Sequence, residues 1–525
     1  MAGAAVTAEP DPLETAAKAG THAGIDTAPQ LKGGMLILAG FILAMANFMA
    51  VLDTAIANVA LPHIAGALAA SPNEGTSVIT FFAVAEAITI PLTGWLAGRF
   101  GSVKVFFVSM ALFGVSSALC GLAPSLNALI FFRILQGLSA GPMMPLSQAL
   151  LLRIVPPAQH AMATALWAMT VIVAPIVGPL LGGWIADNHG WPWVFYINVP
   201  VAIASVFFGW RLLAPHETPS GPRKVDVVGL ALLVFWVGAL QTMLDIGKTE
   251  DWFGSWKVCA LLAAAIIGFF AFCIWEWTEE HPIVDIRVFK NISLSVSTVT
   301  MALVFGVYFG SAVIIPLWLQ TNLAYTATWA GYATAFNGVL AVIMAPIVGR
   351  LVGKFDARAL VSFGLTGLTV LMLWRTTFTQ DMTFWQVSLP QLVQGIFMPL
   401  FFLPLMTVAL GTIPMKDIAN GAAMITFVRT VAGAVAASLM TTAWSDSAIS
   451  ARSNLVGDLH PDALSSAGVA PSMVTPLLDR LVESQAVMVA TNHIFFIIAI
   501  CMGVSAAGIW LAPKPQRRGG GGGGH

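Results

Sequence analysis

Charged side chains are scarce in this sequence. Asp, Glu, Lys and Arg together make up 9% of its 525 residues, against about 25% in a typical soluble domain. Hydrophobic residues reach 58%, which is more apolar surface than a water-soluble fold can bury. A soluble globular protein is therefore excluded. The formal net charge is only −1, so the chain also lacks the basic face that a nucleic-acid partner requires.

Cysteine is rare too. The four cysteines, Cys120, Cys259, Cys273 and Cys501, all lie within or at the ends of apolar stretches, which is typical of small core residues and not of a disulfide framework. His, Cys and Glu nowhere recur at metal-ligand spacing, and no nucleophile or pair of acids suited to catalysis is visible near one interface. We therefore expect no metal site, no cofactor and no enzymatic activity.

Long apolar stretches dominate what remains. Because hydrocarbon offers no partner for backbone amides, segments that cross a bilayer must be helices or strands of a closed barrel. Runs of about 20 apolar residues without period-two alternation favour helices. We predict an all-α membrane protein with 14 transmembrane helices, at residues 35–60, 77–97, 103–122, 126–151, 162–186, 194–213, 227–246, 256–275, 294–319, 329–349, 359–375, 384–412, 418–444 and 489–512.

Lys and Arg are distributed unevenly over the gaps between these helices. With both termini placed in the cytoplasm, 17 of the 24 basic residues fall on the cytoplasmic side and five on the outer side, Arg375 among them. Because Lys and Arg accumulate in cytoplasmic loops, this bias predicts a multi-pass protein with both termini cytoplasmic. The polar start of the chain, without a basic region ahead of a short apolar core, predicts a flexible cytoplasmic tail and not a signal peptide.

The sequence repeats itself weakly. GWLAGRF (94–100) returns as GRLVGKF (349–355), and Gln136-Gly137 returns as Gln394-Gly395. Two parallel six-helix halves, separated by two inserted helices, account for this spacing. The predicted organisation is thus six plus two plus six: a tail at 1–34, a bundle at 35–213, an insertion at 227–275, a second bundle at 294–512 and a tail at 513–525.

One connection is much longer than the others, the 43-residue outer segment 446–488. Loops of this length are usually functional or disordered. Apolar residues recur at helical spacing over 474–491, which predicts an amphipathic helix there. The glycine run at 519–525 fits either a fusion remnant or a native flexible tail.

Three acids stand on predicted membrane helices. Asp53 lies in VLDTAIANVALP (51–62), Glu86 is halfway along the second helix, and Asp245 closes the seventh near the outer interface. A charged carboxylate in hydrocarbon costs about 3 kcal/mol on insertion scales, and pairing, water or protonation offsets that cost. We predict proton coupling for Asp53, a role as proton carrier or partner of a cationic substrate for Glu86, and keep Asp245 as a coupling candidate. The alternatives are helix packing without titration for Asp53, a neutral glutamic acid hydrogen-bonded across helices for Glu86, and an exposed interfacial acid for Asp245. Three further acids, interpreted as solvated charges at a cytoplasmic helix end, are Glu276, Glu279 and Glu280.

Two arginines also fall inside predicted helices. Arg133 lies in FFRILQGLSAGPMMP (131–145) and Arg429 in FVRTVAG. Because Arg stays charged at any accessible pH, each must face an acid, backbone carbonyls or water. We favour proton coupling for Arg133, with a structural ion pair as the alternative, and structural pairing for Arg429.

Two motifs are rich in glycine. In APIVGPLLGG (174–183), Gly178, Gly182 and Gly183 permit close approach of a second helix, and Pro179 removes an amide and bends the helix. In the loop motif GWLAGRFGSVK (94–104), a tight turn and charge contacts are expected to hold one conformation. Its defining residues are Gly94, Arg99 and Gly101.

With these motifs the chain resembles the major facilitator superfamily, and within it the fourteen-helix drug:proton antiporters of the EmrB/QacA type, over residues 35–512. The first-helix motif matches L-D-x-T-x-x-N-V-A-L-P except at Ala55, and APIVGPLLGG matches the antiporter motif except at Ala174. The loop motif carries Gly98 where many relatives have Asp. HGWPWVFYINVP (189–200) and YTATWAG (325–331) resemble the EmrB-like group.

The resemblance implies a proton-coupled multidrug efflux transporter that exports hydrophobic or amphipathic compounds across a bacterial inner membrane. It implies a proton gradient as energy source and a role for Arg133 in proton transfer. The antiporter motif implies that the direction of transport is outward. The implied partners are an EmrA-like membrane-fusion adaptor and a TolC-like outer-membrane channel. Alternatives are an exporter of lipid, fatty acid or another metabolite, an importer on the same fold, and a stand-alone pump.

Residues that contact substrate are the least constrained by sequence. Most Phe, Met and Trp side chains of a membrane protein face lipid or pack in its core. We expect an apolar cavity with a few polar groups, and the candidates for its walls are Phe48, Asn58, Phe305, Tyr308, Asn337 and Phe397.

Overall fold

The computed structural model describes residues 31–70, 72–222, 224–247, 250–414, 417–457 and 471–514, apart from the side chains of a few residues inside helices, Pro179 among them. The described residues form α-helices and short 3₁₀ turns and contain no strand. Twelve apolar helical segments among them are long enough to cross a bilayer, and a bent helix pair makes a thirteenth. A helix of 30 residues, α8, occupies the remaining predicted position. The prediction of an all-α membrane fold is confirmed.

The first nine helices pack into one group. Pro91 separates α3 from α4, which are bent by 56°, because proline lacks an amide and clashes with the preceding turn. Gly141 and Pro142 interrupt the fourth predicted span in the same way, between α6 and α7. The helices are α2 (Gly34–Ala67), α3 (Pro72–Thr89), α4 (Thr93–Phe100), α5 (Ser102–Gly121), α6 (Leu126–Ala140), α7 (Met143–Ile154), α8 (His160–His189), α9 (Trp193–Tyr196) and α10 (Asn198–Leu213).

The last six helices form a second group, and two helices lie between the groups in sequence. Those two, α11 (Val227–Ile246) and α12 (Trp256–Thr278), pack against each other, and α11 contacts α3 of the first group and α17 of the second. Trp236 shares a buried apolar cluster with Ile90 and Phe427. The second group consists of α13 (Ile292–Asn322), α14 (Ala327–Val352), α15 (Ala357–Arg375), α16 (Phe384–Gly411), α17 (Ile418–Gly457) and α19 (Pro471–Gly508).

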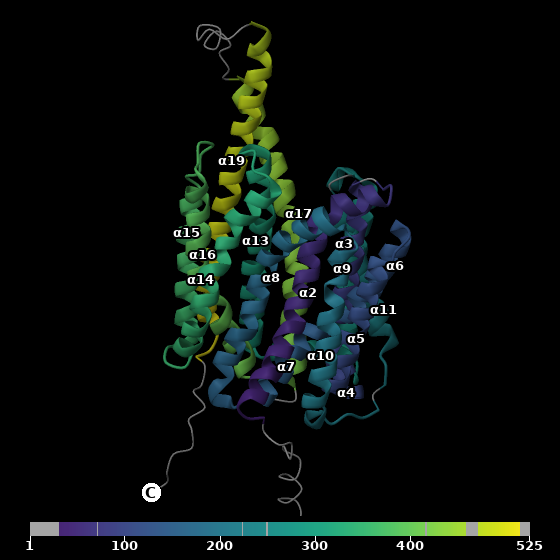
Figure 1. The fold of residues 1–525 in the computed structure, drawn as a ribbon. Coiled ribbons are helices and arrows are strands. Elements are labelled where there is room, and N and C mark those ends of the chain that lie inside the picture. Colours follow the sequence, from purple (N-terminus) through teal and green to yellow (C-terminus); the bar gives the residue numbers. More distant parts are fainter. Residues whose placement is uncertain are drawn as a thin grey trace, which may run out of the picture.

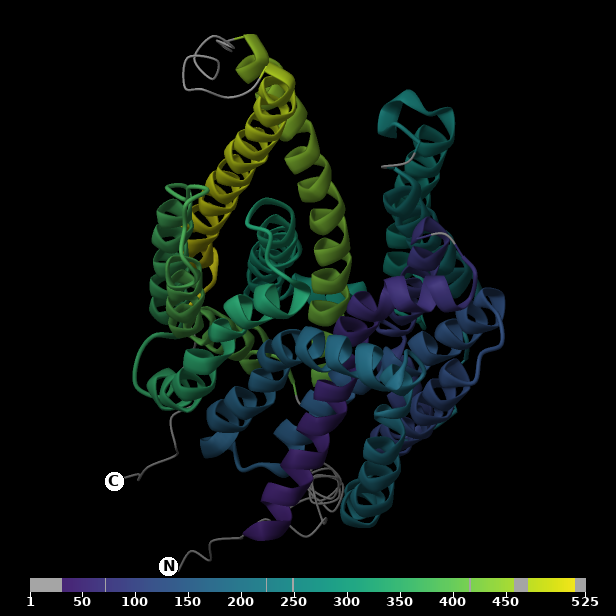
Figure 2. The ribbon, with the colours of Figure 1, turned by 45° about the horizontal axis from the view of Figure 1, so that its top comes forward.

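The two ends of the bundle differ. We call the end where α2 begins and α19 ends the tail face, and the opposite end the hairpin face (Figure 1). At the hairpin face α17 and α19 project beyond the other helices and lean on each other (Figure 2). They have 40 and 38 residues, whereas about 20 suffice to cross hydrocarbon. Arg452 joins them through Asp479 at 2.5 Å and Glu483 at 3.5 Å.

This hairpin corresponds to the long outer segment predicted from sequence. The helix predicted over 474–491 is confirmed as part of α19. Residues 458–470 and 519–525 lie outside the described residues.

At the tail face the two groups are in contact. The first turns of α17 pack against α4 and α7. A Cβ placed on Gly94 would lie 3.3 Å from the Cβ of Asn420, so the loop motif and the start of α17 are in direct contact. Asn420 also donates to the backbone oxygen of Asp285 in the linker between α12 and α13.

Candidate functional site

Asp53 lies at the middle of α2 and is fully buried. Its Oδ2 forms an ion pair with Nη1 of Arg133 on α6 at 2.6 Å. Its Oδ1 accepts from Nε2 of Gln136 at 3.0 Å and from Nδ2 of Asn198 at 2.7 Å. Each of these three side chains donates to the carboxylate, and an ionised aspartate can accept all of these hydrogen bonds. Of the partners expected for Arg133, which were an acid, backbone carbonyls or water, the structure supplies an acid, Asp53.

A further layer of polar groups holds this network in place. Ser117 of α5 accepts from Gln136 at 3.2 Å and from Asn198 at 3.1 Å, and donates to the backbone oxygen of Phe195 at 2.9 Å. Gln136, Ser117 and Asn198 were not among the sequence candidates. Two of them could have been found from the sequence, because Gln136 recurs in the internal repeat and Asn198 lies in the YINVP segment.

Arg133 has bonding capacity that this arrangement leaves unused. Its Nε donates to the backbone oxygen of Val78 at 3.2 Å, and its guanidinium lies 4.0 Å from the ring of Phe82, both on α3. Its Nη2 has no hydrogen-bond partner among the described residues. Gly137 makes this position possible, because any Cβ there would collide with the backbone of α3. A buried guanidinium nitrogen without a partner is costly, so it is available to a second acceptor.

Glu86 stands one turn along α3 from Phe82 and is partly exposed. Within the described part of the chain its carboxylate has neither a hydrogen bond nor an ion pair. The charges that act on it most strongly are those of Arg429 and then Arg133. Arg429 belongs to α17 of the second helix group, is buried, and donates to the sulfur of Met144 on α7. Glu86 and Arg429 therefore face each other across the boundary between the groups.

Asp245 lies apart from this network. It is exposed at the end of α11 and accepts from the Thr80 hydroxyl of α3 at 2.8 Å. This places the carboxylate near the hairpin face, as an anchor between the inserted pair and the first helix group.

The glycines of the antiporter motif bring α8 against α2. A Cβ on Gly178 would collide with Ala55, and one on Gly182 would lie 3.1 Å from Ile56. Gly183 is less constrained, since its Cβ would lie 4.0 Å from Val59. Close packing of α2 against α8 at this point thus requires a small residue at both Ala55 and Gly178. The side chain of Pro179 lies outside the description.

The loop motif obtains its carboxylate from elsewhere in the chain. Glu217, after α10, accepts from the backbone amides of Val103 and Lys104 at the start of α5, each at 2.9 Å. Such capping provides an acceptor for the free amides at the start of a helix, and the negative charge interacts favourably with the helix dipole. Gly101 has φ +94°, and a Cβ there would collide with the Glu217 carboxylate. Arg99 lies 5.7 Å from the ring of Phe100.

In the second helix group the helix equivalent to α5 is α15, and the residue that caps it directly precedes it in the sequence. Asp356, which follows GRLVGKF, caps α15 by accepting from the amide of Arg358 at 3.0 Å, and pairs with its guanidinium at 3.0 Å. The Arg358 hydrogen bonds hold the pKa of Asp356 below its usual value. Both halves therefore place a carboxylate at this helix start, by different routes.

The candidates for the substrate cavity separate into several places. Tyr308, Asn337 and Phe305 lie together, buried, with Asn337 donating to the Tyr308 hydroxyl at 3.0 Å. Phe48 lines an apolar cavity of about 570 Å³ bounded by α2, α7 and α8 of the first helix group and by Val342 of α14. Asn58 is exposed. Phe397 packs into α15 beside Phe363 instead of joining the Tyr308 group.

Two sequence interpretations are wrong. Arg375, counted on the outer side, is 1% exposed and donates to Oε1 of Gln394 at 2.7 Å inside the second helix group. Glu276, interpreted as a solvated charge, is fully buried. Both residues lie at helix ends, and an end position does not reveal which face of a helix turns inward.

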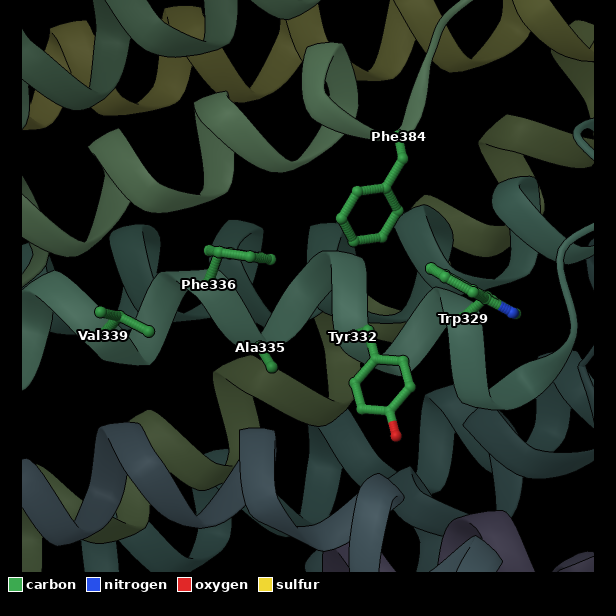
Figure 3. A pocket seen from close by; sticks show the side chains of 6 residues that line it. All are labelled: Trp329, Tyr332, Ala335, Phe336, Val339 and Phe384. Atoms are coloured by element: carbon green, nitrogen blue, oxygen red, sulfur yellow. The ribbon is translucent and has the colours of Figure 1, made fainter.

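A smaller pocket of about 330 Å³ opens between α14 and α16. Figure 3 shows Trp329 and Phe336 of α14 beside Phe384 of α16, while Tyr332 extends to the other side of α14. Exposed aromatic rings near a helix end are typical of the membrane interface. Among the described residues no group of three or more His, Cys, Asp or Glu is arranged to hold a metal.

Residues 43–437 match the family model of the Major Facilitator Superfamily. The "Multidrug export protein EmrB" of Haemophilus influenzae is 44% identical over 93% of this chain and 98% of its own. The "Fatty acid resistance protein FarB" of Neisseria gonorrhoeae is 42% identical over 94% of this chain and 99% of its own. The solved structure of the proton:xylose symporter XylE has a similar fold, with a TM-score of 0.58 at 15% identity over 91% of this chain and 96% of the symporter.

Proposed function

The chain belongs to the Major Facilitator Superfamily, and we propose that it is a proton-driven multidrug exporter of the EmrB type, acting on hydrophobic and amphipathic compounds. It is a multi-pass membrane transporter rather than an enzyme. Similarity over nearly the whole length to a multidrug export protein supports the substrate class. The observation that carries the coupling mechanism is the buried Asp53–Arg133 ion pair with its unused guanidinium nitrogen.

In the proposed cycle Arg133 exchanges acid partners. In the present conformation it pairs with Asp53, while Glu86 has no partner among the described residues. When a proton binds Asp53, the ion pair with Arg133 is lost and Arg133 pairs with Glu86 through Nη2. When the proton leaves Asp53, Arg133 pairs with Asp53 again. Because Arg429 of the second helix group also faces Glu86, each exchange changes the charge balance between the two halves. Alternating access then follows from this change.

The free energy of proton entry is large enough to drive export of a substrate against its gradient. One proton crossing a membrane potential of 100 mV yields about 2.3 kcal/mol. That free energy corresponds to roughly fiftyfold accumulation of a neutral substrate.

The expected location is the bacterial inner membrane with the tail face in the cytoplasm. The excess of Lys and Arg on that side supports this orientation. The contacts of α17 with α4 and α7 then close the cytoplasmic side.

We test the coupling role at Asp53 by substitution. Asp53→Asn alone leaves Arg133 as a buried unpaired charge, at a cost of about 3–5 kcal/mol, so the double variant D53N/R133Q is the informative one. We expect it to reach the membrane and elute as wild type in gel filtration, yet to confer no drug resistance. The matched control is Asp381→Asn, at an exposed position. Full resistance from a well-expressed D53N/R133Q would refute the assignment.

The projecting hairpin is the proposed contact for an EmrA-like adaptor that leads to a TolC-like channel. Its helices extend beyond the bundle where a periplasmic partner would stand. Replacing 446–488 by a short Gly-Ser linker should leave membrane insertion intact and abolish co-purification with the adaptor. Arg452→Ala is the control, because exposed ion pairs contribute only about 0–1 kcal/mol. Undiminished co-purification of the shortened protein would favour a stand-alone pump.

A second candidate is export of amphipathic carboxylic acids. The fatty acid resistance relative supports it, as do Arg375 and Arg429, two buried arginines without an ion-paired carboxylate among the described residues. Resistance assays with long-chain fatty acids beside lipophilic cationic dyes separate the two candidates. Protection against fatty acids alone would favour this one.

A further inference from the structure

Glu276 lies in the last turn of α12, near the tail face, and none of its side chain is exposed. Its Oε2 accepts from the backbone amide of Val284 at 3.2 Å. Its Oε1 is buried and has no partner in the part of the chain that the structure describes. A buried carboxylate oxygen without a donor is expensive, so this atom requires an explanation.

A second carboxyl group stands beside it. Asp226 caps α11 and is 8% exposed. Its Oδ1 accepts from the amide of Gly229 at 2.8 Å, and both its oxygens accept from Nε1 of Trp275, at 2.9 and 3.0 Å. A Cβ placed on Gly229 would collide with both Oδ2 of Asp226 and Oε1 of Glu276. The unpartnered oxygen of Glu276 therefore points to the Asp226 carboxylate.

The charges around this pair do not neutralise it. The ionisable groups that act on Glu276 are Asp226, Asp285 and Glu279, all acidic, and Cys273 lies one turn away on α12. The nearby basic side chains that the structure describes are exposed or engaged otherwise. Lys224 is exposed, Arg287 donates to the backbone oxygens of Trp277 and Glu279, and Lys290 lies over the ring of Trp277. Two adjacent buried carboxyl groups that have no ion-paired cation among the described residues do not both ionise.

We propose that Asp226 and Glu276 form a proton-binding site, in which one proton is held between Oε1 of Glu276 and Oδ2 of Asp226. Glu276 then donates to Asp226 through Oε1 while its Oε2 keeps the Val284 amide. Every buried oxygen of the pair acquires a partner. The proton comes from and returns to water at the tail face, and no other bond changes.

The site is connected to the contact between the two halves. Val284, which Glu276 holds, and its neighbour Ile283 belong to the buried cluster that includes Phe427 of α17 and Ile90, which follows α3. The next residue, Asp285, accepts from Asn420, and Asn420 lies against Gly94 of the loop motif. When the proton leaves, two adjacent carboxylates repel each other and the linker loosens from α17. This step rests on the proposed transport cycle; proton binding itself does not.

The proton-binding site is tested by titrating the purified full-length protein in detergent. An ordinary Glu is fully ionised above about pH 5.5, so between about pH 5.5 and 8.5 the wild type should release one more proton per molecule than Glu276→Gln. The matched control Glu280→Gln, at an exposed position of the same turn, should release as many protons as the wild type. Equal release from E276Q and the wild type would overturn the proposal.

E276Q is also a test of the hydrogen-bond geometry. Its amide supplies a donor to Asp226 and an acceptor for Val284, as the protonated acid does, so the variant should fold with wild-type thermal stability. Failure of E276Q to fold would contradict the proposal.

The link to the tail face has a separate readout, the rate at which the two introduced thiols of a G94C/N420C variant cross-link. An added oxidant in fixed excess drives the cross-linking, in a background without the native cysteines. Because thiols oxidise faster as they become thiolates, the rate is divided at each pH by that of the same variant carrying E276Q, and we expect this ratio to fall severalfold as the pH rises. A ratio that does not change with pH would remove the link and leave the titration result standing. Failure of drug transport with a normal titration would refute the proposed function only.

Discussion

At the scale of single residues, the Asp53 carboxylate depends on three donors from two other helices. The sequence predicts that Asp53 and Arg133 each need a partner, because a charge inside hydrocarbon is costly, but not that they pair with each other. Neutral donors such as Asn198 and Ser117 carry no such requirement. Their role becomes visible only when α5, α6 and α10 are placed around α2.

Removal of Asn198 should change how the transporter responds to pH. A hydrogen bond to a charged group contributes about 1.5–3 kcal/mol, and its loss in Asn198→Ala disfavours the ionised form of Asp53. The pH midpoint of transport should therefore move upward, by about one unit or more. The control is Asn188→Ala, because Asn188 is exposed and bonds only within its own helix. An unchanged pH profile in N198A would remove Asn198 from the coupling network.

At the scale of helices, the sequence predicted position better than orientation. Each of the fourteen predicted ranges contains a helix, since apolar length alone decides that. The rotation of each helix is set by its neighbours, which is why the burial of Arg375 and Glu276 was missed. The length of α17 was also hidden, because its part beyond residue 444 is rich in polar residues.

The contact between α2 and α8 gives a prediction at this scale. Gly178→Val introduces a branched side chain where even a single Cβ collides with Ala55, so α8 must move away from α2. Overpacking of this kind costs about 1–3 kcal/mol or more. We expect transport to fall at least tenfold. Gly183→Ala on the same helix, where the added Cβ makes an ordinary contact, is the control and should retain activity. Comparable transport by both variants would show that close approach at Gly178 is dispensable.

At the scale of the whole molecule, the two helix groups are joined by α8 against α14 and by α17 against α4 and α7 at the tail face, and they are bridged by α11 and α12. The internal repeat predicted two equivalent halves, yet it said nothing about which end is closed. That information lies in contacts between residues more than 300 positions apart, such as Gly94 with Asn420. Pairings of this kind leave no pattern in a single sequence.

A disulfide across that contact should arrest transport. A Cβ on Gly94 would lie 3.3 Å from the Cβ of Asn420, near the separation of about 3.5–4.5 Å that a disulfide requires. In a background without the four native cysteines, oxidised G94C/N420C should therefore cross-link and lose transport, and reduction should restore it. Each single cysteine variant is a control that should stay active under oxidation. Transport by the cross-linked protein would show that the tail face need not open.

The central claim is that proton movement through the Asp53–Arg133 pair drives export. The most direct measurement is uptake of a fluorescent lipophilic cation into proteoliposomes with an acidic lumen. We predict that accumulation increases with the imposed pH gradient and is abolished by a protonophore. It should not depend on a sodium gradient, and it should be absent in D53N/R133Q. Accumulation without a pH gradient, or full gradient-driven uptake by D53N/R133Q, would contradict the account.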